Sequence, residues 1–328
     1  YRDEMMGYLM KKVNVKSDNQ LELQNFEKYA NEVFYQEQEI TKNLSPSIAV
    51  ILAEGEVSTT GDGLSSLEIC KLLKKARNEI SIKTVVLRIN SPGGSALASE
   101  EIWREVALTN KVKKVIVSMG DVAASGGYYI ASPAFKIFAE PTTITGSIGV
   151  FGMIPYTGKM LENKLGITFD RVSTNKHSVL SINRKLSAEE LAITQAEVDK
   201  IYDQFLKRVA DGRKMTKDEV NAIARGRVWT GRDALRIGLV DQLGGLTDAI
   251  AFAAKESKLG DAKVIYYPLV EENLLIKLVD MFEEESKAGL HLKPNAMPKE
   301  FIEYYEKLKK IEGMFGIQMR LPYDLTIK

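Results

Sequence analysis

Two strand-like runs of this chain each end in a turn of serine and glycine, and a helix-like stretch follows each turn. The first run leads into residues 90–95 (NSPGGS), and the second leads into residues 119–131 (MGDVAASGGYYIA). Runs rich in β-branched residues favour buried strands, and repeated strand–turn–helix units favour a parallel sheet. The carboxyl ends of neighbouring parallel strands meet at one edge of a sheet, so the two turns are expected to face each other.

Ser125 stands on the second turn, ahead of a helix-like stretch that begins near Gly127. Because the first N–H groups of a helix are free, the amide of Gly126 is a candidate oxyanion donor if Ser125 attacks a carbonyl. Gly94 on the first turn is the second candidate donor, since glycine has no side chain to block a substrate. A close-packed corner between strand and helix uses glycine in the same way, so the turns alone leave both interpretations open.

The chain offers few bases for Ser125, because its histidines are His177 and His291. His291 lies in a polar stretch and is expected at the surface. Lys176 is a better candidate, since a serine and a lysine form a known type of catalytic dyad. An apolar, partly desolvated site lowers the pKa of an amine and lets it accept a proton. The alternative is that Lys176 is an ordinary exposed charge, as most lysines are.

The order of the motifs along the chain resembles the signal peptide peptidase A family of bacterial serine peptidases. The matching segments are residues 90–95 (NSPGGS), 119–128 (MGDVAASGGY), 145–152 (TGSIGVFG), 228–234 (VWTGRDA) and 238–241 (GLVD). The resemblance implies an α/β fold of the Clp protease and crotonase type, with a parallel sheet and added helices at both ends. It implies Ser125 as the nucleophile and Gly94 and Gly126 as the oxyanion donors. Ser147 takes the place of the hydroxyl that orients the lysine.

The resemblance leaves two sources for that lysine. Lys176 lies 51 positions after Ser125, which is the offset implied for members that carry both residues on one half-length chain. In full-length members, which are tandem duplications, the amino-terminal half supplies the lysine and the carboxy-terminal half supplies the serine. This chain resembles that carboxy-terminal half. The base is therefore expected to be either Lys176 or a lysine from an amino-terminal half of the same precursor.

The alternation of strand-like and helix-like stretches independently predicts an α/β fold with a parallel sheet. Residues 187–214 are expected to form a helix that opens with a capping box of Ser187 and Glu190, and Thr230 is expected to cap another helix. Strands are expected near residues 48–53, 84–89, 115–119 and 136–140, with helices after the first three. The predicted domains are a connector, helical or partly disordered (1–45), a peptidase domain (46–268) and a carboxy-terminal helical extension (269–328).

Composition excludes several classes of protein. A net charge of +1 with interspersed acids and bases gives no case for nucleic acid, and a single cysteine, Cys70, excludes an intrachain disulfide. Neither glycine turn has the full spacing of a nucleotide-binding loop, and no cofactor or metal is expected. No apolar run is long enough to span a bilayer. The resemblance implies a ring-shaped or dome-shaped homo-oligomer, associated with the cytoplasmic membrane of bacteria on its extracytoplasmic side.

The expected reaction is hydrolysis of apolar peptides through an acyl-enzyme, and the resemblance implies remnant signal peptides as substrates. Val150, Phe151 and Met153 are candidates for the wall of a substrate pocket, because their apolar run lies next to Ser147. Two other classes stay open. A crotonase-like enzyme acting on acyl thioesters would use the same backbone donors, and a non-enzymatic half that builds an assembly would not need Ser125.

Overall fold

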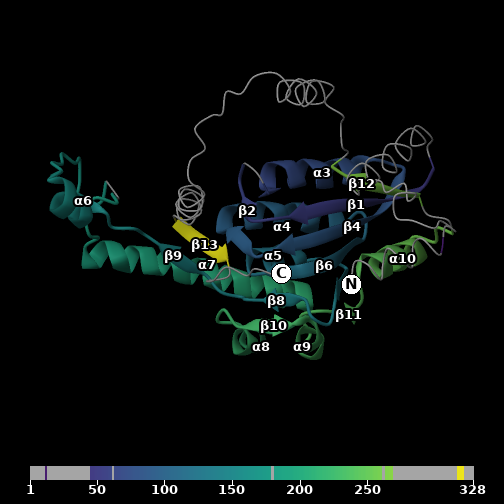
Figure 1. Cartoon of the computed structure of the whole chain (residues 1–328). Helices are drawn as coiled ribbons and strands as arrows, with labels where there is room; N and C mark the ends of the chain where they lie inside the picture. Colours follow the sequence, from purple (N-terminus) through teal and green to yellow (C-terminus); the bar gives the residue numbers. More distant parts are fainter. Residues whose placement is uncertain are drawn as a thin grey trace, which may run out of the picture. The chain divides into compact units, whose positions relative to one another are not determined.

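The computed structural model describes residues 45–60, 63–178, 181–260, 263–268 and 316–320, together with Lys12. The described residues from 46 onward belong to one compact unit, which holds all the helices and strands named below. This unit is built on a central sheet with helices packed against it (Figure 1).

The strands are β1 (Ser47–Glu54), β2 (Val57–Ser58), β3 (Leu64–Ser65), β4 (Ile82–Ser91), β5 (Gly93–Ser95), β6 (Val115–Ala124), β7 (Lys136–Ala139), β8 (Ile144–Gly146), β9 (Phe151–Met153), β10 (Val228–Thr230), β11 (Gln242–Leu243), β12 (Lys263–Tyr267) and β13 (Gly316–Arg320). The helices are α3 (Ser66–Asn78), α4 (Ala96–Asn110), α5 (Gly126–Ala131), α6 (Gly158–Leu165), α7 (Ala188–Arg213), α8 (Lys217–Ile223), α9 (Gly231–Arg236) and α10 (Leu246–Glu256).

The larger sheet has the strand order β10-β8-β6-β4-β1-β12, with β7 paired to β6 and β11 paired to β7. Strands β1, β4 and β6 run parallel, and both faces of this centre are covered. Alternate residues of β1 serve the two faces: Ile51 packs into the core that holds residues of α3, α4 and α5, whereas Val50 packs with residues of α10. Burial on both faces explains why these strands read as continuous apolar runs in the sequence.

Strand β6 bends before it reaches Ser125. Between the residues that pair with β4 at Met119 and at Ala123, β6 holds two more residues than β4 does. The Asn90 side chain accepts a hydrogen bond from the amide of Val122 at 3.2 Å and thereby links β4 to the bent segment. The last part of β6 pairs with β8 rather than with β7. The bend therefore places Ser125 beside the end of β8.

A second, smaller sheet has the order β3-β2-β5-β13-β9. Strand β13 runs antiparallel to both of its neighbours and lies between β5, which begins at the first glycine turn, and β9, which follows Ser147 (Figure 1). Residues that are far apart in the sequence therefore meet at the edge of the sheet where the two turns lie.

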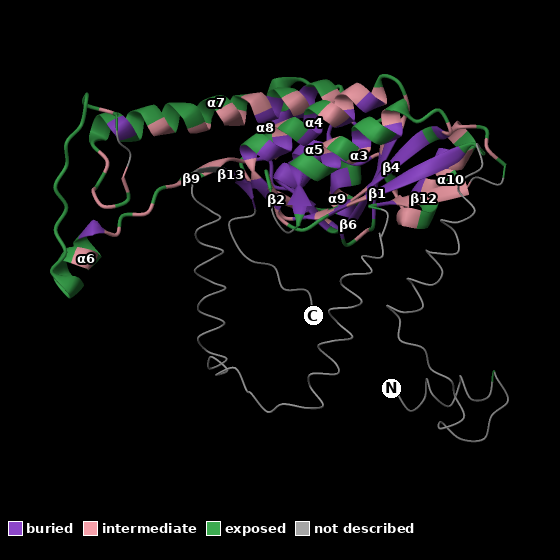
Figure 2. Cartoon of the chain, turned by 90° about the horizontal axis from the view of Figure 1, so that it is seen from above, coloured by how far each residue is buried: buried purple, intermediate pink, exposed green. Residues whose placement is uncertain are grey.

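Residues 154–186, which we call the arm, run from the end of β9 to the start of α7 and include α6. Figures 1 and 2 both show α6 and the first turns of α7 away from the strands of the central sheet. Many of the large apolar side chains of the arm are exposed: Ile154, Tyr156, Met160, Leu165, Ile167, Phe169, Val172 and Ile182. Exposed apolar side chains gathered in one segment are typical of a surface that contacts another chain.

The prediction of an α/β fold with a parallel sheet is confirmed. The four expected strands and the three helices that follow them are present, although β6 continues to Ala124. The capping box of Ser187 and Glu190 and the cap at Thr230 are also present. Pattern and propensity predicted these elements well because each agrees with its tertiary environment.

The three predicted domains stay predictions, because most of residues 1–45 and 269–328 lie outside the described residues. Within the predicted carboxy-terminal helical extension, residues 316–320 form the strand β13 rather than a helix. Their pairing with β5 and β9 explains the difference, since neighbouring strands decide the conformation of such a short segment. Among the described residues, no helix is long and apolar enough to cross a membrane.

Candidate active site

Ser125 occupies the corner between β6 and α5 in a strained backbone conformation. Its φ of 53° and ψ of −114° lie in a region that residues with a side chain rarely adopt, at a cost of about 1–3 kcal/mol. The Ser125 amide donates to the carbonyl of Gly146 at 2.8 Å, and the Ser125 carbonyl accepts from the amide of Tyr129 at 2.8 Å. The surrounding fold thus holds the strain in place. Strained strand-to-helix corners carry nucleophilic serines in some hydrolases of other folds.

The two tyrosines that follow the corner anchor α5 to the rest of the unit. The Tyr128 hydroxyl donates to the carbonyl of Leu239 at 2.8 Å, and the Tyr129 hydroxyl donates to the carboxylate of Glu100. Burial raises the pKa of both phenols, so both remain neutral hydrogen-bond donors. The Tyr129 ring also packs against Phe205 of α7, with ring centroids 4.8 Å apart. These contacts fix the position of Ser125 from the helix side.

The Ser125 side chain is completely buried, and its Oγ has no hydrogen-bond partner among the described residues. A buried polar group without a partner costs about 1–3 kcal/mol, so native proteins rarely keep one without a reason. A nucleophile that meets its base only in a larger assembly is one such reason.

Ser147 lies on the neighbouring corner. It follows β8 directly, its φ is 48°, and its amide donates to the carbonyl of Arg227 at 2.7 Å. Since the amide of Ser125 bonds to Gly146, the residue before Ser147, the structure brings the two serines together. Both have a positive φ, which is uncommon for residues other than glycine and is concentrated at functional sites.

The glycines of the two turns approach each other at Gly93 and Gly126. A Cβ atom on Gly126 would lie 3.3 Å from the Cα of Gly93 and only 2.5 Å from the Oγ of Ser99. A Cβ atom on Gly94 would instead lie 2.1 Å from the carbonyl oxygen of Val57. The role of Gly94 stays a prediction, and the structure adds Gly93 as the glycine of the first turn that lies against Gly126. The doubled glycine was the available signal, since both residues have a positive φ.

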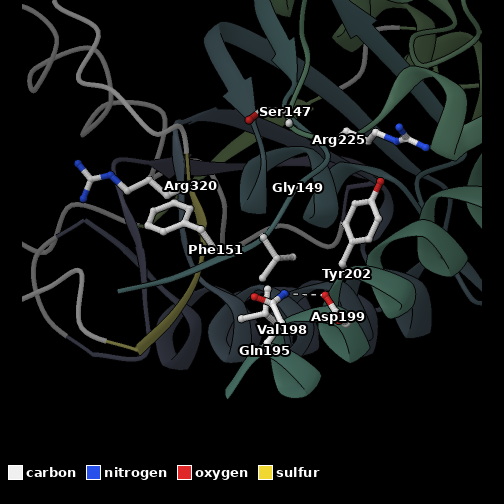
Figure 3. A pocket seen from close by; sticks show the side chains of 11 residues that line it. Ser147, Gly149, Phe151, Gln195, Val198, Asp199, Tyr202, Arg225 and Arg320 are labelled. Atoms are coloured by element: carbon white, nitrogen blue, oxygen red, sulfur yellow. Dashed lines mark hydrogen bonds between the residues drawn. The ribbon is translucent and has the colours of Figure 1, made fainter. Parts of the chain in front are cut away.

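A cavity of about 420 Å³ opens beside Ser147, between β9 and α7 (Figure 3). Val150 and Phe151 line it, whereas Met153 lies further along β9 and is not a lining residue. Figure 3 shows the phenol of Tyr202 and the guanidinium of Arg225 on the side of Ser147. The cavity therefore combines an apolar wall with polar groups, as is typical of sites that bind organic ligands.

Lys176 lies on the arm, where its side chain is 73% exposed and its Nζ forms an ion pair with Glu189 near the start of α7. The neighbouring His177 is also held there, with Nε2 3.1 Å from a carboxylate oxygen of Glu189. Within one chain the structure therefore does not bring Lys176 to Ser125. The role of Lys176 as the base stays a prediction. His291 lies outside the described residues.

Three comparisons place the chain among known proteins. The sequence model of peptidase family S49 matches residues 107–260. "Putative signal peptide peptidase SppA" of Enterococcus faecium is 38% identical over 256 residues, which cover 72% of this chain and 73% of that protein. "Protease 4" of Salmonella typhi is 42% identical over 225 residues, or 67% of this chain and 36% of that protein. "Serine protease SPPA, chloroplastic" of Arabidopsis thaliana is 36% identical over 271 residues, or 79% of this chain and 39% of that protein.

The chain belongs to peptidase family S49, the family of the signal peptide peptidases named SppA. It spans 36% of the length of the Salmonella relative and 39% of the Arabidopsis relative. Among solved structures, a mutant of ClpP1 from Listeria monocytogenes aligns with 61% of this chain and 94% of its own, at a TM-score of 0.43 and 17% identity.

Proposed function

We propose that this chain is a serine peptidase lobe in which Ser125 is the nucleophile and the general base is Lys176 of a second copy. The observation that carries the proposal is the strained, buried Ser125, whose Oγ has no hydrogen-bond partner among the described residues. Membership of family S49 supports peptide hydrolysis as the reaction. Ser147 on the next corner supports a lysine as the base, because its hydroxyl can accept a hydrogen bond from a neutral amine and orient it.

In the proposed reaction, a neutral lysine amine takes the proton of the Ser125 hydroxyl while Oγ bonds to the carbonyl carbon of the substrate. The carbonyl oxygen becomes an oxyanion, which the amides of Gly94 and Gly126 stabilise by hydrogen bonds. The lysine then gives the proton to the departing amine as the peptide bond breaks. Water hydrolyses the acyl-enzyme by the same proton transfers and frees Ser125.

The exposed apolar side chains of the arm support a second copy as the source of the base. They lie on the same segment as Lys176, so docking of the arm onto another copy would bury them and carry the amine with them. Burial near Ser147 would favour the neutral form of the amine, which is the form that accepts a proton. A lysine from an amino-terminal half of the same precursor is the alternative source.

The proposed substrates are extended, apolar peptides, and remnant signal peptides at the cytoplasmic membrane are their proposed biological source. Val150 and Phe151 support the choice, because they give the cavity beside Ser147 an apolar wall. Met153 is proposed to contact the peptide further along β9. The free edge of a strand binds a peptide through main-chain hydrogen bonds, whatever the sequence of the peptide. Apolar pockets such as this cavity then select its side chains.

The experiment compares hydrolysis of a fluorogenic apolar peptide by the chain and by its Lys176→Ala variant. Activity in the parent and its loss in the variant support a self-sufficient serine and lysine peptidase. An inactive parent that gains activity when a lysine-bearing amino-terminal half is added would remove Lys176 from the mechanism. Binding of a coenzyme A thioester without peptide hydrolysis would instead favour a crotonase-like enzyme.

A further inference from the structure

A second cavity, of about 480 Å³, lies at the end of α5 that is opposite to Ser125. Its lining comes from residues 133–135, which follow α5, from residues between 208 and 214 at the end of α7, and from α4. It shares no lining residue with the cavity beside Ser147. A cavity of this size accommodates a small organic molecule, so the described part of the chain offers a site apart from the candidate active site.

The walls of the second cavity are fixed by contacts within the chain. A Cβ atom on Gly212 would lie 2.0 Å from the carbonyl oxygen of Ser132, so α7 touches the chain directly after α5. The Arg213 side chain is only 7% exposed and binds the Asp241 carboxylate through two hydrogen bonds, of 2.5 and 3.1 Å. These contacts form before any ligand arrives, and sites for small molecules are usually preformed in this way.

Aromatic rings form an apolar wall of the second cavity. Trp103 and Phe135 both line it, and the guanidinium of Arg208 stacks on the indole of Trp103, 3.7 Å from the ring centroid. The indole N–H of Trp103 is buried and has no hydrogen-bond partner among the described residues. Buried donors are nearly always paired. A carboxylate in the cavity would supply the kind of acceptor that this N–H lacks.

Two opposite charges of the lining also have no partner. Asp211 and Lys214 are exposed, and neither side chain forms a hydrogen bond or an ion pair with another described residue. The two arginines of the lining are already paired with carboxylates. A simple anion in the cavity would be repelled by Asp211, and a simple cation would be repelled by Lys214. A zwitterion would satisfy both charges.

We propose that the second cavity binds a free α-amino acid with an apolar side chain. The ammonium group of the ligand meets Asp211, its carboxylate meets Lys214, and its side chain lies against Trp103 and Phe135. An α-amino acid suits the site because both of its charges stand on one carbon, and Asp211 and Lys214 are only three positions apart at the end of α7. The inference goes beyond the proposed function, since binding requires neither Ser125 nor a base.

The test measures binding of L-phenylalanine to the full chain by isothermal titration calorimetry. A Kd of about 1 mM or lower is expected. 3-Phenylpropionate, which lacks the ammonium group, and phenylethylamine, which lacks the carboxylate, should compete at least about tenfold more weakly. Asp211→Asn and Lys214→Met should each weaken L-phenylalanine by a similar factor. The matched controls Asp218→Asn and Lys71→Met remove the same charges from exposed positions outside the cavity and should bind like the parent.

Three results would overturn the inference. The first is the absence of any binding heat at 5 mM L-phenylalanine, a concentration about five times the expected Kd. The second is that either analogue competes as well as L-phenylalanine itself, which would show that the site does not recognise a zwitterion. The third is that the control variants lose as much affinity as Asp211→Asn and Lys214→Met, which would place binding elsewhere. Peptide hydrolysis is measured separately, so the proposed function stands or falls independently of these results.

Discussion

The corner that carries Ser125 and the arm that carries Lys176 are built in opposite ways. The corner is buried, held by main-chain hydrogen bonds to Gly146 and Tyr129, and strained at Ser125. The arm exposes its apolar side chains and holds Lys176 by an exposed ion pair. Under the proposed mechanism, the corner holds the nucleophile in place within one chain, whereas the base reaches it only through a contact with another copy.

The largest loss of activity is expected from replacing Ser125 at the corner. Ser125→Ala should lower peptide hydrolysis by at least about 10,000-fold, because no other group replaces the nucleophile. The matched control is Ser132→Ala, since Ser132 is a buried serine at the end of α5 whose hydroxyl donates to the carbonyl of Tyr129. The measurement is the initial rate of peptide hydrolysis at equal protein concentration. Equal losses in both variants would show that the corner acts only through packing.

A smaller loss is expected from crowding the proposed oxyanion donor. Gly126→Ala places a Cβ atom 2.5 Å from the Oγ of Ser99 and should lower the rate of hydrolysis by about 100-fold, the effect of losing one oxyanion donor. Gly260→Ala is the control, because a Cβ atom there would meet nothing within 4 Å. Labelling of Ser125 by a fluorophosphonate should fall in parallel. A normal rate in Gly126→Ala would remove this amide from the mechanism.

The arm is tested by a charge on its exposed apolar surface. Val172 is 96% exposed, so Val172→Asp should leave the melting temperature unchanged but weaken assembly and lower hydrolysis by about tenfold. The control is Ile80→Asp, since Ile80 is 80% exposed but lies outside the arm. Light scattering after size-exclusion chromatography measures the assembly. If both variants assemble and hydrolyse like the parent, the arm is not a docking surface.

The smallest effect is a pH dependence of local stability around Glu190, where the arm joins α7. The hydrogen bonds from Arg184 and from the amide of Ser187 hold the pKa of Glu190 well below its usual range, with His177 also nearby. A lowered folded-state pKa adds stability above the unfolded value of about 4.3, and this stability is lost as the pH falls below that value. After correction for intrinsic exchange, amide exchange at the start of α7 should therefore speed up on acidification below about pH 4.3. Glu190→Gln should weaken this pH dependence and leave the part that comes from Glu189, whose pKa is also lowered by its hydrogen bonds with Lys176 and His177.

Much of the fold was predictable because local and tertiary preferences agree. The strands around Val50 and Leu87 are buried on both faces, so they appear in the sequence as continuous apolar runs. The capping box at Ser187 is likewise a local signal with a local cause. The bend of β6 and the strand β13 were not predictable, because both depend on pairing with segments far away in the sequence.

The candidate site also has a part that the sequence predicted and a part that it did not. The motifs indicated Ser125, Ser147 and Gly126, and the structure brings these residues to adjacent corners. The contact of Gly93 with Gly126 depends on how closely two turns approach in space, which spacing along the chain does not reveal. The offset between Ser125 and Lys176 indicated a pair, but an offset does not specify which copy supplies each residue.

The central claim is that a second copy completes the site, and subunit mixing tests it most directly. Ser125→Ala and Lys176→Ala variants, each inactive alone, are dissociated, combined in equal amounts and reassembled before peptide hydrolysis is measured. With random pairing, half of the sites carry an intact Ser125, and half of these meet a copy with an intact Lys176. About a quarter of the parent rate should therefore return. No recovery in an assembly that contains both variants, or full activity of Lys176→Ala alone, would contradict the account.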